Sequence, residues 1–218
     1  MSPQVYFFGK ELPVRGKPII SGKTGPVSRF IGRTALRLVG WREMSGPPDI
    51  QKYVLVAAPH TTNMDLFYML FATMAMQLPV TWMMKDTVFW WPLGSLWRAL
   101  GGIPVNRRAA GNVVREMVDI FNEQAQLAVL IAPEGTRKAV KHWKLGFYWM
   151  ALGAGVPIVP GYINHELKQI GIGEPIPVTG DIAADFERLR AFYGEKTGIY
   201  PDYDERQALR NPLERGPK

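Results

Sequence analysis

Apolar and polar positions alternate between two periods along the chain, and this alternation predicts an α/β fold. Four continuous apolar runs are typical of strands that are buried on both faces of a parallel sheet. They cover residues 53–58, 80–84, 127–132 and 156–163. Helical periodicity separates them, over residues 66–76, 90–100, 113–123 and 147–153. We therefore expect a mostly parallel central sheet flanked by helices, with ligands in the loops after the strand ends.

A basic amphipathic helix is predicted before this alternating region, over residues 28–42. A helical projection places Arg29, Arg33 and Arg37 on one stripe. Apolar positions, which include Phe30, Ile31, Leu38 and Trp41, lie beside it. The helix fits either an interfacial membrane segment or a surface helix packed on the core with solvated arginines. We expect residues 1–46 to form a basic arm with this helix, and residues 47–218 to form the main domain.

The excess positive charge of the chain lies in the same N-terminal region. The net charge is +7, and residues 1–42 hold eight basic residues against one acidic residue. An anionic partner surface would therefore meet the N-terminal fifth of the chain. Nucleic acid is not the expected partner, because no nucleic-acid-binding motif accompanies the charge. The anionic surface of a membrane is the other candidate partner.

Composition excludes several chemistries. The chain has 218 residues and no cysteine, which rules out disulfides, thiolate nucleophiles and cysteine-ligated metals. No other metal constellation is present, and no metal or cofactor is expected. The longest apolar stretch, residues 66–76, is about half the length of a membrane-spanning helix. The first residues lack the pattern of a secretory signal, so a cytoplasmic setting is expected.

A histidine and a carboxylate follow the first predicted strand. His60 lies at the switch from strand to helix, and Asp65 comes five residues later. If Thr62 caps the helix, Asp65 falls in its first turn and can hold one imidazole nitrogen. The other nitrogen can then accept a proton. Alone, the spacing also fits a capping box in which His60 is an ordinary loop residue.

Two further loops place cations at the same end of the predicted sheet. The glycine-rich loop at residues 101–107 ends in Arg107, and its glycines permit close approach of a ligand. Pro133-Glu134-Gly135-Thr136-Arg137 follows another buried strand. Two arginine loops at one edge indicate an anion site, because the planar guanidinium group suits phosphate.

Together these segments carry a family resemblance. His-x4-Asp at residues 60–65, Gly-Gly-Ile-Pro-Val-Asn-Arg at 101–107, Pro-Glu-Gly-Thr-Arg at 133–137 and Val-Pro-Ile-Val-Pro at 156–160 occur in this order. In order and spacing, they resemble the 1-acylglycerol-3-phosphate acyltransferases, within the wider glycerolipid acyltransferases. The resemblance covers roughly residues 53–163, and under it residues 47–218 form an acyltransferase domain.

The resemblance implies a role for each residue of these motifs. His60 would act as general base on an acceptor hydroxyl, and Asp65 would orient it. The acceptor's phosphate end would be bound by Arg107, Glu134, Gly135, Thr136 and Arg137, with Glu134 fixing Arg137 or the loop backbone. The hydroxyl of a lysophospholipid would attack acyl-CoA or acyl-carrier protein directly, and the best specific candidate is 1-acylglycerol-3-phosphate, which gives phosphatidate. Such an enzyme is expected as a peripheral or monotopic protein on the cytoplasmic face of a membrane.

Several alternatives stay open. Pro59, Ala132 and Lys138 differ from the residues that are commoner at these motif positions in the family. Another lyso-lipid or hydroxylated lipid therefore remains a candidate acceptor. A non-catalytic lipid-binding protein is the rival from another class. The methionines of residues 64–84 and the aromatic residues that follow them either line an acyl channel or fill the core. We assign His142 and His165 to structure, because neither belongs to a recognisable pattern.

Overall fold

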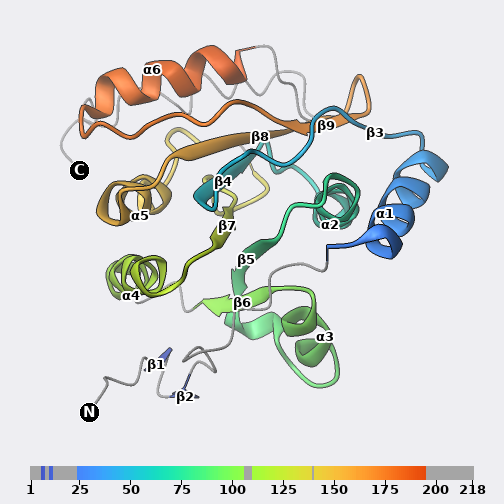
Figure 1. Ribbon diagram of the computed structural model, residues 1–218, viewed down its shortest axis with the longest axis horizontal. Helices are drawn as coiled ribbons and strands as arrows, with labels where there is room; N and C mark the ends of the chain where they lie inside the picture. Colours follow the sequence, from blue (N-terminus) through green and yellow to red (C-terminus); the bar gives the residue numbers. More distant parts are fainter. Residues whose placement is uncertain (1–5, 8–9, 12–23, 106–109, 139, 195–218) are drawn as a thin grey trace.

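The structure is a computed structural model and describes residues 6–7, 10–11, 24–105, 110–138 and 140–194. In this part of the chain seven strands form one sheet, in the order β3-β9-β8-β4-β7-β5-β6 (Figure 1). Their bounds are β3 Arg42–Glu43, β4 Lys52–Ala58, β5 Val80–Lys85, β6 Gly102–Val105, β7 Leu127–Ile131, β8 Ile158–Asn164 and β9 Gln169–Ile172. Two short strands, β1 (Tyr6–Phe7) and β2 (Lys10–Glu11), pair separately and antiparallel.

The strand directions determine where the loops meet. Strands β8, β4, β7, β5 and β6 are joined by parallel pairings. Only the β8–β9 pair of this sheet is antiparallel among the strands described. The carboxyl ends of the five parallel strands therefore meet at one edge, which we call the carboxyl edge. The expected α/β fold with a mostly parallel sheet is confirmed.

Helices cover both faces of the sheet (Figure 1). Their bounds are α1 Pro26–Leu38, α2 Met64–Met76, α3 Leu93–Ala99, α4 Ala110–Glu123, α5 Gly146–Ala154 and α6 Ile182–Tyr193, with a short 3₁₀ helix, η1, at Asp86–Val88. The apolar core divides accordingly. Val54 and Val56 of β4 pack with side chains of α4, α5 and α6. Tyr53 and Leu55 point to the other face and pack with side chains of α1 and α2.

Helix α1 packs directly on α2, and a glycine makes this contact possible. A Cβ atom on Gly32 would lie 2.5 Å from the carbonyl oxygen of Phe71 and 2.6 Å from the amide nitrogen of Ala75. Leu36, one turn later, is fully buried. The two helix backbones therefore approach as closely as a residue without a side chain allows.

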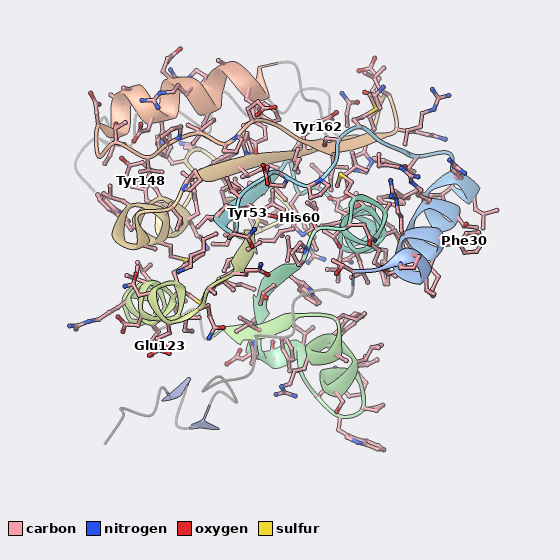
Figure 2. The ribbon with its side chains drawn as sticks, in the orientation of Figure 1. Phe30, Tyr53, His60, Glu123, Tyr148 and Tyr162 are labelled. Carbon is pink, nitrogen blue, oxygen red and sulfur yellow. The ribbon has the colours of Figure 1, made fainter. Side chains whose placement is uncertain are left out.

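Helix α1 ends earlier than the sequence pattern predicts. It stops at Leu38, and the chain turns through Gly40 at φ +79°. Trp41 consequently leaves the helix, and its side chain is buried with an exposed fraction of 4%. The prediction that Trp41 lies on the same helix as Arg29, Arg33 and Arg37 is wrong. Phe30 and Leu38 do remain exposed, with Phe30 on the outer side of the molecule (Figure 2).

Other differences from the expected elements are local. The glycine-rich segment, predicted as a loop, forms edge strand β6, where Pro104 is tolerated because one side of the strand needs no hydrogen-bonding partner. Helix α3 starts at Leu93 rather than Trp90, because Pro92 precedes it as the cap residue. No helix among the described residues combines the length and apolar character that crossing a bilayer requires.

Candidate active site

A cavity of about 830 Å³ opens at the carboxyl edge of the sheet. It is lined by residues that end or follow β4, β5 and β7, and by side chains of α2, α4 and α5. Most of the lining side chains are apolar, and they include Met69, Trp82, Met83, Phe147 and Met150. The polar residues that line it include His60, Asp65, Lys85, Arg137 and Lys144. A cavity of this size and character can hold a small ligand with a long apolar part.

His60 and Asp65 contact each other at the lining of this cavity. The imidazole Nδ1 of His60 lies 3.2 Å from the carboxylate Oδ2 of Asp65. His60 follows β4 near the middle of the molecule (Figure 2), and Asp65 lies in the first turn of α2. The carboxylate has an exposed fraction of 1%, whereas the imidazole has 29%. The pair thus presents one buried charge and one accessible ring.

Local backbone geometry explains why these two residues meet. The Asp65 carboxylate accepts hydrogen bonds from the backbone N–H groups of Thr61, at 2.6 Å, and Thr62, at 2.7 Å. The Thr62 hydroxyl donates to Asp65 Oδ1 at 2.8 Å, and the Asp65 N–H donates back to that hydroxyl at 3.3 Å. These reciprocal bonds between Thr62 and Asp65 have the form of the capping box considered from the sequence, but the helix begins at Met64 and its cap residue is Asn63 rather than Thr62. The bonds bring the carboxylate back over the His60 loop.

The ionisation of Asp65 reflects these contacts. Burial raises the pKa of the Asp65 carboxyl group, but hydrogen bonds from His165, His60 and Thr62 outweigh it. The resulting pKa lies well below the ordinary value of an aspartate. Asp65 is therefore a carboxylate throughout the neutral and mildly acidic range.

Glu134 supports the position of His60 from a neighbouring loop. This glutamate follows β7 and has an exposed fraction of 2%. Its Oε1 accepts a hydrogen bond from the backbone N–H of His60 at 2.8 Å. Strands β4 and β7 are adjacent in the sheet, so the two loops leave the carboxyl edge side by side. Glu134 thus holds the main chain that carries the imidazole.

The rest of this loop brings cations to the cavity. Gly135 adopts φ +63°, and a Cβ atom there would meet the ammonium nitrogen of Lys144 at 2.6 Å. Thr136 and Arg137 are exposed and line the cavity. A guanidinium nitrogen of Arg137 donates to the side-chain carbonyl of Asn63, in the His60 loop. Arg107, predicted to complete the anion site, lies outside the described residues.

The family model for acyltransferases matches residues 42–164, which span both the His60 loop and the Glu134 loop. The chain belongs to the acyltransferase family. The curated relatives include the 1-acyl-sn-glycerol-3-phosphate acyltransferase of Escherichia coli strain K12, which is 28% identical over 139 residues. That match covers 60% of this chain and 55% of the relative, so the chain spans about half the length of that protein. The enzyme of the same name from Haemophilus influenzae is 29% identical over 190 residues, 77% of each chain.

A solved structure supports the fold of this acyltransferase. The crystal structure of the 1-acyl-sn-glycerophosphate acyltransferase from Thermotoga maritima superposes with a TM-score of 0.55. The match covers 88% of this chain and 80% of the other, at 18% sequence identity. At that identity the likeness supports the architecture alone. Family membership, predicted from the motifs, is confirmed by the sequence comparisons.

Other residues of the candidate site were not predicted from the sequence. His165 lies directly after β8, and its Nε2 is 2.9 Å from Asp65 Oδ1. Lys85 ends β5 and lines the cavity. Both positions are at the carboxyl edge, so the rule that places ligands after parallel strands is a signal that could have found them. Lys144 follows no strand directly, and we find no comparable sequence signal for it.

The methionines of residues 64–84 and the aromatic residues that follow them were expected either to line a channel or to fill the core, and the structure shows some of them in each place. Met69, Met83 and Trp97 line the cavity. Met76 belongs to the buried core on the α2 face of the sheet. Trp90 and Trp91 are instead exposed, with fractions of 58% and 83%. Some of these side chains thus shape the cavity, and others fill the core.

The ionisation of Asp65 predicts a pH-dependent stability. Asp65→Asn keeps the shape but removes the charge, so at pH 7 we expect the free energy of unfolding to fall by about 1.5–3 kcal/mol. Because the folded pKa lies below the unfolded value of about 3.9, the stabilisation is present above that pH and is lost as pH falls towards the folded pKa. The difference between wild type and variant, measured by urea unfolding, should therefore shrink between about pH 4 and pH 2. A difference that stays constant over this interval would contradict the lowered pKa of Asp65 in the folded protein.

Proposed function

We propose that the protein transfers a fatty acyl group from acyl-CoA or acyl-carrier protein to the free hydroxyl of a lysophospholipid. The best candidate acceptor is 1-acylglycerol-3-phosphate, which gives phosphatidate. The observation that carries the proposal is the His60–Asp65 pair, which lies in a largely apolar cavity with cations in its lining. An acyl chain suits the apolar lining, and a phosphate suits the cations. The names of the curated relatives support the choice of acceptor.

The geometry supports a direct transfer with His60 as general base. Nδ1 of His60 faces the Asp65 carboxylate, so Nε2 is the nitrogen that can take the proton from the acceptor hydroxyl. The hydroxyl oxygen then attacks the thioester carbonyl carbon and forms a tetrahedral intermediate. Collapse of that intermediate breaks the carbon–sulfur bond, and the departing thiolate takes the proton from the imidazolium. Asp65 stays ionised and stabilises the imidazolium while it exists.

The cations in the cavity lining support recognition of a phosphate head group. Arg137 and Lys144 line the cavity beside the His60 loop, and Lys85 enters from the end of β5. We propose that the first two bind the acceptor phosphate, together with Arg107. Gly135 allows Lys144 to pass close to the backbone of this loop, where a side chain would obstruct it. Glu134 and Thr136 belong to the same loop, and Glu134 ties it to the catalytic histidine.

Helix α1 is proposed as the contact with an anionic membrane. Four apolar side chains of this helix, Val27, Phe30, Ile31 and Leu38, are exposed by 46% or more. Arg29 and Arg37 are exposed on the same helix, whereas Arg33 is paired with Glu43 at 2.6 Å. An exposed apolar face flanked by cations suits the boundary between head groups and acyl chains. We place the protein at the cytoplasmic face, as a peripheral or monotopic enzyme.

The role of His60 predicts the phenotype of its removal. His60→Ala should lower kcat by about 10² to 10⁴, the usual contribution of a positioned general base, with little change in the unfolding midpoint. The assay is mass-spectrometric detection of the acylated product from acyl-CoA and a lysophospholipid. His142→Ala is the matched control, because that half-buried histidine does not line the cavity. Wild-type turnover by His60→Ala would contradict the proposal, and binding of lipid without any turnover by the wild type would favour the lipid-binding alternative.

The anion site predicts a selective effect on the acceptor. Arg137→Ala should raise the acceptor KM by roughly ten- to a hundredfold, which corresponds to about 1.5–3 kcal/mol for a charged hydrogen bond. The donor KM should stay unchanged in the same steady-state assays. Arg115→Ala, an exposed arginine on α4, is the control. An unchanged acceptor KM with a raised donor KM would reassign Arg137 to the phosphates of the coenzyme.

The membrane proposal predicts salt-sensitive binding to anionic vesicles. Arg29→Glu/Arg37→Glu reverses two exposed charges on α1 and leaves the Arg33–Glu43 pair intact. In co-sedimentation this variant should bind anionic liposomes more weakly than wild type, since each cation near such a surface contributes about 1 kcal/mol. Wild-type binding should also weaken as salt rises. Arg115→Glu/Lys141→Glu carries the same charge change elsewhere on the surface, and equal binding by the two double variants would overturn the role of α1.

A further inference from the structure

A second imidazole contacts the catalytic carboxylate from the far side of the pair. His165 Nε2 lies 2.9 Å from Oδ1 of Asp65, whereas His60 Nδ1 lies 3.2 Å from Oδ2. The carboxylate is therefore held between two histidines that are 105 positions apart in the chain. His165 is not among the residues that line the cavity, and its side chain has an exposed fraction of 13%. It is placed to act on Asp65 rather than on a substrate.

The two carboxylate oxygens receive different sets of donors. Oδ2 accepts from the backbone N–H groups of Thr61 and Thr62, and faces His60. Oδ1 accepts from the Thr62 hydroxyl and faces His165. The terminal torsion of an aspartate is soft, so its orientation depends on the donors at both oxygens. Without His165, the Thr62 hydroxyl would be the remaining side-chain donor at Oδ1 among the described contacts.

Aromatic side chains hold the His165 ring in place. Trp41 meets it edge-on, with ring centroids 5.1 Å apart and an interplanar angle of 89°. Tyr68, one turn after Asp65 on α2, lies 6.2 Å from it and stacks on Trp41 at 4.4 Å. Trp41 is itself buried against the core. This packing leaves the imidazole few alternative orientations, so its nitrogen is directed at Asp65 before any substrate binds.

We propose that His165 is a positioning residue for acyl transfer, which keeps the Asp65 carboxylate aligned with Nδ1 of His60. Its Nε2–H donates to Oδ1, so neutral His165 carries its proton on Nε2. The donated hydrogen bond fixes the carboxylate plane and leaves Oδ2 directed at the general base. Asp65 in turn orients the His60 ring and stabilises its protonated form. The inference rests on the proposed role of His60 as base, and it adds the group that holds the orienting carboxylate.

Replacing the imidazole of His165 with a phenyl ring, which has no nitrogen atoms, tests the proposal. His165→Phe keeps an aromatic ring between Trp41 and Tyr68 but cannot donate to Asp65. We expect kcat to fall by roughly ten- to a hundredfold, as is typical when a group that orients a functional residue is lost, while both KM values stay near wild type. A residue needed only for packing would tolerate the phenyl ring, so an unchanged kcat would overturn the proposal.

A pair of amide variants keeps the test decisive if the phenyl ring disturbs folding. The amide nitrogen of His165→Gln lies about as far along the side chain as Nε2 of histidine, whereas that of His165→Asn is too short to reach Asp65. Both variants are neutral and polar. We expect Gln to restore most of the lost kcat and Asn to restore little. Equal activity of the two would show that the hydrogen bond to Asp65 does not matter for turnover.

A double-mutant cycle between His165 and Asp65, together with His60→Ala, distinguishes a failure of this inference from a failure of the proposed function. In an Asp65→Asn background, His165→Phe should lower kcat by much less than in the wild-type background, because both changes remove one interaction. Fully additive effects would mean that His165 acts elsewhere. If His60→Ala abolishes transfer while His165→Phe does not reduce it, only the inference fails. If His60→Ala keeps wild-type turnover, the proposed base itself is wrong.

Discussion

The site depends on one buried negative charge, the carboxylate of Asp65. A charge removed from water is costly unless hydrogen bonds replace its hydration. Here the loop after β4 provides two backbone donors, α2 carries the carboxylate, and the chain after β8 brings a second imidazole. The need to satisfy this charge thus draws two separate segments together, residues 61–65 and the chain after β8. The position of the His60 ring therefore depends on the contacts that hold Asp65 as well as on the residues next to His60 in the sequence.

The parallel sheet explains why these segments meet. Strands β8, β4 and β7 are neighbours, so the chain leaving each of them emerges at the same edge. His165 follows the first, His60 the second and Glu134 the third. Glu134 accepts from the main chain of His60, while His165 contacts the carboxylate that faces the ring of His60. His60, the proposed general base, is therefore supported through both its backbone and its side-chain partner by residues that follow adjacent strands.

The sequence predicted those features of the fold and site that depend on neighbouring residues. The apolar runs indicated the buried strands, and the spacing from His60 to Asp65 indicated a contact across a helix start. His165 was missed because its partner is distant in sequence and no local pattern joins them. Trp41 was misplaced because helical periodicity continues beyond Leu38, while the turn at Gly40 redirects the side chain into the core. Strand β6 was taken for a loop because its glycines obscure the pairing with β5.

The close packing of α1 on α2 bears on how such an enzyme would sit at a bilayer. At Gly32 the two backbones are so near that neither helix can rotate or separate without losing the contact. Helix α2 carries Asp65 in its first turn, so the proposed membrane helix packs directly on the helix that carries the proposed orienting carboxylate. With α1 seated among head groups, the cavity would keep a constant height and tilt above the surface. Substrate would then arrive by two-dimensional diffusion of lipids toward a fixed opening, and the membrane itself would set the approach angle of the acceptor hydroxyl.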